Sequence, residues 1–454
     1  MKRKKVLGFK DLVLFTFCAI FGVEAIAASA AIGPSAISWW LICLAGYFLP
    51  FGFIAAELGS TYPEQGGIYV WIKMALGKKW AARSTWYYWI SLPIWLPAIY
   101  IAITEIIGHM FFPSIRLWQQ LAIGVILIWV AVGINLCPLK FSKWIPNAGS
   151  IVQFLIVIGM LVSAGVYFAK NRSFANEINM ANMLPNFNAA IVFIPMIIYN
   201  LMGCELVSAA AGEMKNPARD IPKALILSAF AIAALYLITT FAVWVVIPID
   251  KINVASGILH VFTITFSGHA MQQVVTVAFG VLISFAFFAG IVTWNIGQNR
   301  TVAEAANNGE LPAMLGRMNK DMAPVGASVI SGIISTVVIL CYGLIARNAA
   351  ELFWHAVSFS LIVGLFSYLM LFPSFIVLRK KNKNIKRPYR VPGPDWFGAL
   401  LAVMAEIFVL AAVSILVIQP GHDFTRFALP VIAGVLIVIG VGEIFVARFK
   451  YRVE

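Results

Sequence analysis

The sequence predicts an all-α polytopic membrane protein with twelve transmembrane helices, and three observations support this fold class. Of the 454 residues, 61% are hydrophobic and only 11% are charged, whereas about a quarter of a typical soluble chain is charged. The mean hydropathy is +0.90. Apolar residues gather in stretches of about 20, the length that a helix needs to cross a bilayer. These observations exclude a soluble enzyme, a disordered scaffold, a coiled coil and a secreted disulfide domain.

Twelve apolar stretches follow one another along the chain, and each is expected to be one span. They cover residues 11–33, 36–58, 86–112, 117–137, 147–169, 188–212, 222–247, 270–298, 324–346, 352–378, 396–417 and 426–447. The basic N-terminus, from Met1 to Lys5, precedes a stretch that is too long for a signal peptide and has no cleavage motif. We therefore expect this first stretch to be a span.

The basic residues predict the orientation of the spans, because short cytoplasmic loops carry an excess of Lys and Arg. With the N-terminus inside, most of the 33 Lys and Arg fall in inside segments. The exceptions are Arg116, Lys170, Arg172, Lys251, Arg347 and Arg426. We expect a multi-pass protein of the cell membrane (plasma or inner) with both termini in the cytoplasm. The net charge of +14 then reflects membrane topology and not a nucleic-acid partner.

Motifs for catalysis and metal binding are absent from the sequence. It holds neither a His-Glu-x-x-His zinc motif nor a Gly-x-Ser-x-Gly nucleophile elbow, and its five histidines are scattered near span ends and loops. The five cysteines lie in apolar segments without metal-ligand spacing, so they are interpreted as small buried residues. We expect no catalytic residue, no metal and no cofactor, and the oligomeric state stays open. A channel is an alternative class of membrane protein, and it would need a continuous polar path across the membrane. A measurement of saturable countertransport would exclude a channel.

Several acidic residues lie inside the predicted spans. Four of them are well within apolar stretches, at depths where no Lys or Arg is found: Glu24, Glu105, Glu205 and Glu406. A carboxylate in the middle of a membrane is costly and indicates a functional site by default. Without a cationic side chain it must be protonated, hydrogen-bonded or matched to a cation from outside the protein. The last option predicts a cationic substrate.

Two of these acids share one sequence context. Residues 22–31 in span 1 and 203–211 in span 6 both read Gly-x-Glu followed by small residues. Small residues alone usually mean close helix packing, but packing does not explain a charge. Because five spans separate the two motifs, they predict an inverted repeat of spans 1–5 (1–169) and 6–10 (188–378), with spans 11–12 (396–447) outside it. In such transporters the first helix of each repeat breaks at the substrate site, and Gly22 and Gly203 would permit the breaks.

The other polar features have less specific interpretations. Glu57 at the cytoplasmic end of span 2 is expected to be structural, and Glu406 to be a local hydrogen-bonding partner. Glu105 lies in the outer half of span 3, where it either contacts the substrate or attracts cations into a vestibule. Residues 66–77 are expected to form an amphipathic helix on the cytoplasmic surface. The basic residues 379–390 are interpreted as an orientation signal, with contact to anionic lipid as the less favoured alternative.

Three ordered motifs resemble the amino acid–polyamine–organocation transporter superfamily, most of all its glutamate:GABA antiporter branch and amine-exchanging relatives. The motifs are found at residues 55–58 with 63–71, at 203–205 with 212–222, and at 294 with 308–312 and 317–320. The similarity covers most of the chain. It implies a 5+5 inverted repeat with broken spans 1 and 6, and transport by alternating access.

The resemblance also implies roles for aromatic residues. Tyr199 and Trp294 fall where arginine:agmatine exchangers carry aromatic gates, and an aromatic face attracts ammonium or guanidinium groups. Weaker candidates for the same site are Trp95, Tyr100 and Asn200. The predicted substrate site therefore combines the two aromatic gates with glycines and glutamates of the spans. It contains Gly22, Glu24, Glu105, Tyr199, Gly203, Glu205 and Trp294.

One departure from the family pattern predicts the substrate. Amino acid transporters of this superfamily often carry a Gly-Ser-Gly-type break in span 1, whose free amides bind the α-carboxylate. Here the matching residues are Gly22-Val23-Glu24, and a fixed carboxylate would repel a substrate carboxylate while pairing with an amine. We therefore expect a small cationic amine, with agmatine:putrescine antiport as the first choice. The alternatives are an amino acid:amine or amino acid exchanger (glutamate/GABA-like or tyrosine/tyramine-like) and a proton-coupled polyamine importer.

Overall fold

The computed structural model describes residues 4–112, 115–187, 191, 194–253, 257–345, 349–418 and 429–448. Every regular element in these ranges is a helix, and an isolated β-bridge joins Leu7 to Met214. The predicted all-α class is therefore confirmed for the described part of the chain.

The helices of the first half mostly follow the predicted spans. They are α1 (Phe9–Ile20), α2 (Val23–Ala30), α3 (Ala36–Cys43), the π-helix η1 (Leu44–Phe48), α4 (Leu49–Thr61), α5 (Ile68–Leu76), α6 (Lys78–Phe111), α7 (Leu117–Leu136), α8 (Leu139–Ser142) and α9 (Trp144–Asn171). α3, η1 and α4 form one uninterrupted helical stretch, which corresponds to predicted span 2.

The second half continues in the same manner. Its helices are α11 (Ile194–Asn200), the 3₁₀ helix η2 (Leu206–Glu213), α12 (Pro217–Val246), η3 (Ile249–Lys251), α13 (Gly257–Thr265), α14 (Gln272–Asn307), η4 (Ala313–Gly316), α15 (Val325–Ile345), α16 (Ala349–Lys381), α17 (Asp395–Ile418) and α18 (Leu429–Arg448). The predicted start of span 6 at residue 188 and the predicted start of span 12 at residue 426 lie outside the described residues.

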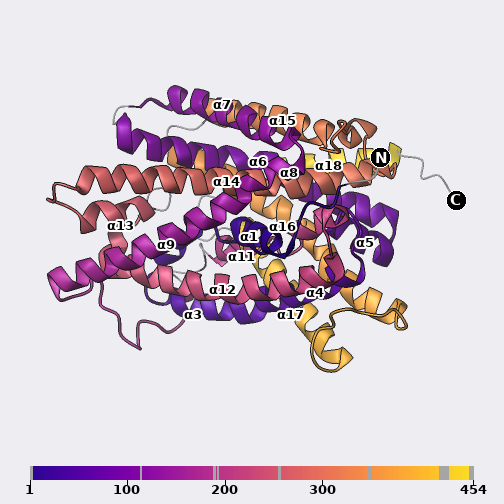
Figure 1. Cartoon of the computed structure of the whole chain (residues 1–454), viewed down its shortest axis with the longest axis horizontal. Helices are drawn as coiled ribbons and strands as arrows, with labels where there is room; N and C mark the ends of the chain where they lie inside the picture. The colour runs from indigo at the N-terminus through magenta and orange to yellow at the C-terminus, as the bar shows by residue number, and fades with distance from the viewer. Residues whose placement is uncertain are drawn as a thin grey trace.

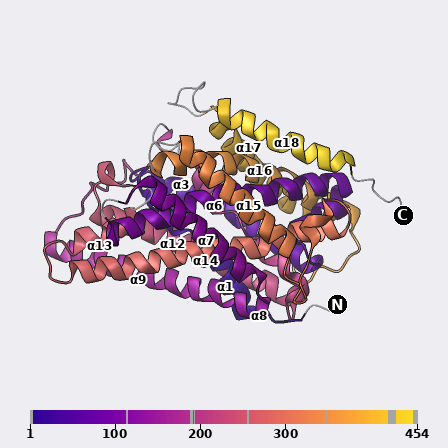
Figure 2. The same cartoon turned by 90° about the horizontal axis from the view of Figure 1, so that it is seen from above.

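The short helix α1 lies in the middle of the bundle. It packs against α9, α12 and α14, which surround it in Figure 1. α6 packs along α14 and α16, and α4 packs along α12. α17 and α18 lie at the outer edge of the molecule (Figure 2), where α17 contacts α16 and α18 contacts α6 and α16. The two interrupted helices are thus enclosed by long ones.

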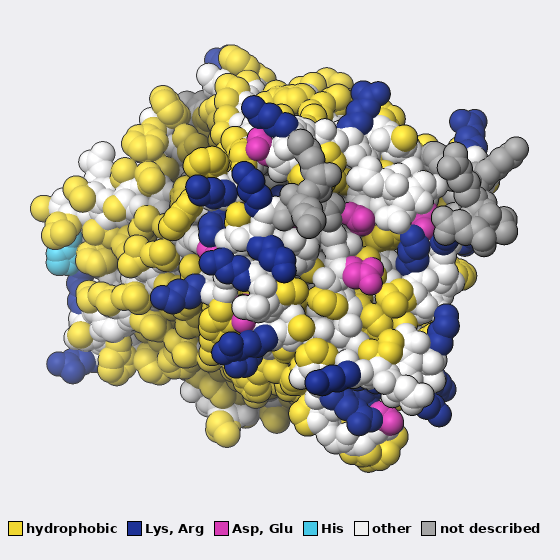
Figure 3. Space-filling view, turned by 45° about the vertical axis from the view of Figure 1, so that its right-hand side comes forward, with side chains coloured by type: hydrophobic (Ala, Val, Ile, Leu, Met, Phe, Trp, Pro, Cys, Tyr) yellow, Lys and Arg dark blue, Asp and Glu magenta, His cyan; other side chains and the backbone are white. Residues whose placement is uncertain are grey.

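The length and composition of the helices fit a membrane protein. Nine of the helical stretches in the described residues are long and apolar enough to cross a membrane. The predicted spans 1 and 6 are not among them, because each is interrupted, and the apolar stretch of α15 (Val325–Cys341) is shorter. Figure 3 shows hydrophobic side chains over much of the surface, with Lys and Arg gathered on one face. A count of twelve crossings therefore stays a prediction.

The prediction of an amphipathic surface helix at residues 66–77 is only partly correct. The segment forms α5, but its first five residues, Ile68 to Ile72, are all buried. α5 packs against α6 and α16, so it is embedded in the protein and does not lie flat on a membrane surface.

Candidate functional site

The first helix of the chain breaks where the sequence predicts. α1 ends at Ile20 and α2 begins at Val23, so Phe21 and Gly22 are not helical. The Tyr236 hydroxyl of α12 bridges the break, since it donates to the Ile20 carbonyl (2.7 Å) and accepts from the Gly22 N–H (2.8 Å). Unpaired backbone groups inside a membrane are costly, so this side chain helps to make the break possible.

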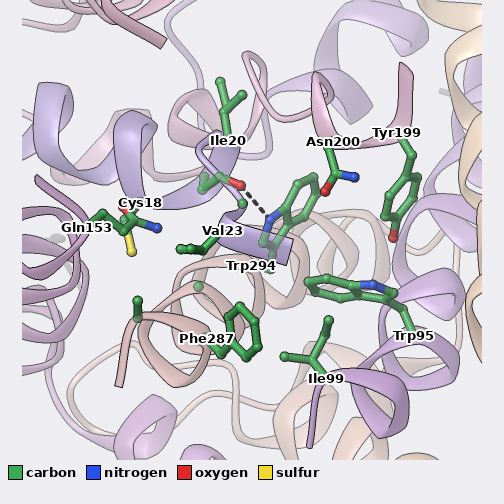
Figure 4. Close-up of a pocket in the computed structure, with 14 residues that line it drawn as sticks. Cys18, Ile20, Val23, Trp95, Ile99, Gln153, Tyr199, Asn200, Phe287 and Trp294 are labelled. Carbon is green, nitrogen blue, oxygen red and sulfur yellow. Dashed lines mark hydrogen bonds between the residues drawn. The ribbon is translucent and has the colours of Figure 1, made fainter. Parts of the chain in front are cut away.

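Two further side chains satisfy carbonyls next to the same break. Gln153 Nε2 of α9 donates to the Phe21 carbonyl at 2.8 Å. Trp294 Nε1 of α14 donates to the Ala19 carbonyl at 2.9 Å (Figure 4). The break is therefore held from α9, α12 and α14 together.

The second predicted break lies between α11 and η2. α11 ends at Asn200, η2 begins at Leu206, and Gly203 between them has φ +113°. A Cβ atom on Gly203 would lie only 3.2 Å from a ring carbon of Trp294 and 3.3 Å from the Ile20 side chain. Glycine is thus required both for the backbone conformation and for the close approach of the indole.

A pocket lies between the two breaks. Its fourteen lining residues come from α1, α2, α6, α9, α11 and α14, and from the first break: Cys18, Ala19, Ile20, Gly22, Val23, Trp95, Ile99, Gln153, Tyr199, Asn200, Ala286, Phe287, Gly290 and Trp294. Five of the predicted residues are brought together here: Gly22, Trp95, Tyr199, Asn200 and Trp294. The free space is about 30 Å³, so the pocket is a small cavity in this conformation.

Three aromatic rings form one wall of this pocket. Figure 4 shows Trp95 beside both Tyr199 and Trp294. The ring centroids of Trp95 and Tyr199 are 6.1 Å apart, and those of Trp95 and Trp294 are 6.4 Å apart, each pair at a steep angle. The lining residues include no Lys or Arg. Such a wall suits a cation, which gains roughly 0.5–2 kcal/mol over an aromatic face.

Glu24 is the second residue of α2, directly after the Val23 that lines the pocket. The side chain of Glu24 lies outside the described residues. The first N–H groups of a helix have no partner within the helix, and they favour negative charge nearby. A glutamate in the first turn of α2 is consistent with that preference.

Glu205 does not line the pocket in this conformation, although the sequence predicts it as a substrate contact. Its side chain is 1% exposed, and Oε1 accepts hydrogen bonds from Tyr88 of α6 (2.6 Å) and Tyr368 of α16 (2.7 Å). Oε2 has no hydrogen-bond partner in the described part of the chain. Glu205 follows Gly203 by two residues, and Gly203 lies against the Trp294 ring, so the backbone of the second break adjoins the pocket.

Glu105 and Tyr100 also lie away from the pocket. Both are on α6, and Glu105 is ten residues beyond Trp95, which is about 15 Å along a helix. Tyr100 is fully buried, and neither residue lines the pocket. For Glu105, this position fits the vestibule role better than direct contact.

The glutamates near the span ends bind arginines. Both oxygens of Glu57, which is 2% exposed, accept from Arg379 (2.9 and 2.6 Å), and Arg387 lies 3.1 Å from Oε1. Glu443 pairs with Arg83. The predicted structural role of Glu57 is confirmed. Glu406 does not match its predicted role as a local hydrogen-bonding partner, since its buried Oε2 has no such partner among the described residues.

Some residues of the site carry no recognisable signal in the sequence. Gln153 and Tyr236 are each one of several polar side chains in largely apolar helices, and Tyr88 and Tyr368 resemble ordinary core aromatics. Only the fold shows that the first two hold a helix break and that the last two enclose Glu205. A search for isolated polar residues in spans would have found Gln153.

Comparisons with known proteins agree with this architecture. The family model described as amino acid permease matches residues 7–441. The chain belongs to this permease family. It is 32% identical to the "Probable agmatine/putrescine antiporter AguD" of Lactococcus lactis subsp. lactis, over 99% of this chain and 96% of that protein. An uncharacterized transporter of Legionella pneumophila is 29% identical over 92% of this chain and 91% of its own length.

A third relative is the glutamate/gamma-aminobutyrate antiporter of Lactococcus lactis subsp. lactis. It is 27% identical, over 83% of this chain and 76% of its own length. The permease is thus a membrane transporter and not an enzyme, as the sequence predicts. The resemblance to the superfamily and to its antiporter branch is confirmed.

Proposed function

We propose that this permease exchanges small cationic amines across the cell membrane, with agmatine and putrescine as the first pair. The observation that carries the proposal is the pocket between two helix breaks, walled by Trp95, Tyr199 and Trp294 and lined by no basic residue. The glutamate at the start of α2 supplies the negative charge that an amine needs. The printed name of the 32% identical relative supports the same substrates.

The full membrane architecture is part of this proposal. Twelve crossings would place both termini in the cytoplasm, and the two interrupted helices would begin the repeats 1–169 and 188–378, with 396–447 outside them. The two breaks at Gly22 and Gly203 support the repeat, because they occupy the same place in each predicted half. Most of the basic residues then face the cytoplasm, as orientation rules require.

The transport step follows from the small size of the pocket. The pocket has only about 30 Å³ of free space in this conformation, so rings must move before a molecule of the size of agmatine enters. Once bound, its amino and guanidinium groups contact the aromatic wall and Glu24. Glu205 would then be a second binding position for the cation. Movement of Trp294 and of the two tyrosines that enclose Glu205 would open a route from the pocket to its carboxylate.

Exchange follows from the cost of unpaired charge. If the carboxylates are ionised, enclosing them without a cation is unfavourable, so the carrier reorients poorly unless it is loaded. A proton on Glu24 would replace the cargo and give a proton-coupled importer instead. An amino acid:amine exchanger is the other alternative, favoured by the glutamate/gamma-aminobutyrate antiporter among the relatives.

The test is uptake of radiolabelled putrescine into proteoliposomes with and without internal agmatine. The proposal predicts fast uptake only with internal agmatine and no effect of a collapsed pH gradient. Uptake that needs no internal cargo but needs the pH gradient would establish the importer. Uptake of labelled glutamate or tyrosine at the rate of putrescine would establish the amino acid exchanger.

A further inference from the structure

A groove lies on the outside of the bundle, apart from the transport pocket. It has a volume of about 700 Å³ and runs between α12 and the connection from α16 to α17. Its α12 wall contains Arg219, Lys223, Leu227 and Phe230, and its other wall contains Pro388 and Tyr389. The substrate site contributes none of these residues.

The α12 wall changes from charged to apolar along one helix face. Positions 219, 223, 227 and 230 are three or four residues apart, so they share a face. Leu227 and Phe230 are each 54% exposed, although they belong to a helix that is apolar enough to span a membrane. From Arg219 to Leu227 the helix rises about 12 Å, which matches the step from a lipid headgroup into the acyl region.

The two cations of the groove, Arg219 and Lys223, have no acidic partner among the described residues. In contrast, the three arginines of the nearby basic stretch 379–390 are paired, since Arg379 and Arg387 bind Glu57 and Arg390 binds Asp395. The available positive charge at this end of the molecule therefore includes the two residues of the groove.

The second wall is held in a fixed position. Arg387 pairs with Glu57 at 3.1 Å, and the Val391 N–H donates to Glu57 Oε2 at 2.7 Å. Pro388 and Tyr389 lie between these two anchors in the chain. A ligand in the groove would therefore contact α12 on one side and a segment tied to α4 on the other.

We propose that this groove binds one anionic phospholipid of the inner leaflet, with its phosphate at Arg219 and Lys223 and an acyl chain along Leu227 and Phe230. The charge of the rim and the apolar floor together fit a lipid and neither a soluble anion nor a neutral lipid. The bound lipid joins α12 to the α16–α17 connection and thereby stabilises the cytoplasmic end of the bundle.

The test uses native mass spectrometry of the detergent-purified full chain, titrated with phosphatidylglycerol or with phosphatidylcholine. We expect one retained phosphatidylglycerol, bound at least tenfold more tightly than phosphatidylcholine and not displaced by millimolar inorganic phosphate. Equal retention of the two lipids would overturn the proposal, as would displacement by phosphate, because the groove would then not distinguish a lipid by its charge and chain together.

Variants locate the site. Arg219→Gln with Lys223→Gln should reduce retention of phosphatidylglycerol at least fivefold, whereas Lys140→Gln with Lys320→Gln, which removes the same charge from another exposed part of the same end, should not. Leu227→Trp keeps both cations and fills the apolar floor, so it should also reduce retention. Wild-type retention in both groove variants would place the lipid elsewhere and contradict the proposal.

Discussion

Tyr236 bridges the first helix break through a single atom, its hydroxyl oxygen. Its hydroxyl is hydrogen-bonded to both sides of the first break, while its ring stacks on Trp40 with centroids 4.4 Å apart. The hydroxyl thus replaces hydrogen bonds that an unbroken helix would make by itself. The ring remains in place if only the oxygen is removed.

Tyr236→Phe should therefore impair transport more than folding. The Gly22 N–H still donates to the Ile20 carbonyl at 2.8 Å, but each of the two groups loses its hydrogen bond to the hydroxyl. Each lost hydrogen bond costs about 0.5–1.5 kcal/mol, so we expect transport to fall about tenfold. Putrescine uptake in proteoliposomes measures this effect. Tyr87→Phe, on the half-buried surface of α6 outside the pocket, is the matched control and should behave like the wild type.

Glu24→Gln should abolish exchange of diamines, because the amide keeps the shape of the side chain but cannot neutralise a cation. Uptake of labelled putrescine against internal agmatine measures the loss. Glu105→Gln, about 15 Å from Trp95 along α6, should retain exchange with a raised KM. If Glu24→Gln transports at the wild-type rate, the acid is structural.

The sequence predicts the residues of the site unevenly. Gly22, Tyr199 and Trp294 are brought together as expected, since each belongs to a motif or a helix break. Glu205 is displaced from the pocket because two tyrosines from distant helices enclose its carboxylate. No local pattern in a sequence reports such long-range hydrogen bonds, so the partners of buried polar groups had to come from the structure.

Among the elements, the two breaks are the best predicted feature. Each combines a glycine, an acid and small residues, and each interrupts a helix within a few residues of the expected place. The burial of α5 is not predicted, because a short amphipathic segment looks the same whether its apolar face meets lipid or other helices. Periodicity identifies the face but not what covers it.

A buried ion pair joins α4 to the end of α16, and this pair gives a prediction about stability. Glu57→Gln leaves Arg379 and Arg387 without their carboxylate in a site where the acid is 2% exposed. Removing one partner of a buried pair costs about 3–5 kcal/mol, so the thermal unfolding temperature in detergent should fall clearly.

Glu443→Gln is the matched control for this element. Its partner is Arg83, but the glutamate side chain is 43% exposed, and exposed pairs contribute about 0–1 kcal/mol. We expect little change in the unfolding temperature. Equal effects of the two substitutions would mean that burial of the Glu57 pair does not determine its contribution.

At the scale of the whole molecule, the bundle encloses two interrupted helices within long ones. The pocket between the breaks has aromatic rings and no cation, and the acids near it are α2's first-turn glutamate and the enclosed Glu205. This arrangement favours a ligand that brings positive charge and no negative charge. The proposed exchange of amines therefore requires the pocket to discriminate against substrates that carry a carboxylate.

The most direct measurement compares ligands that differ only by that group. Agmatine is arginine without its carboxylate, and putrescine is ornithine without its carboxylate, so each pair isolates the charge. Inhibition of labelled putrescine uptake in proteoliposomes should require at least tenfold less agmatine than arginine and at least tenfold less unlabelled putrescine than ornithine, a difference of about 1.4 kcal/mol or more. Arginine and ornithine that inhibit as well as their amines would contradict the account.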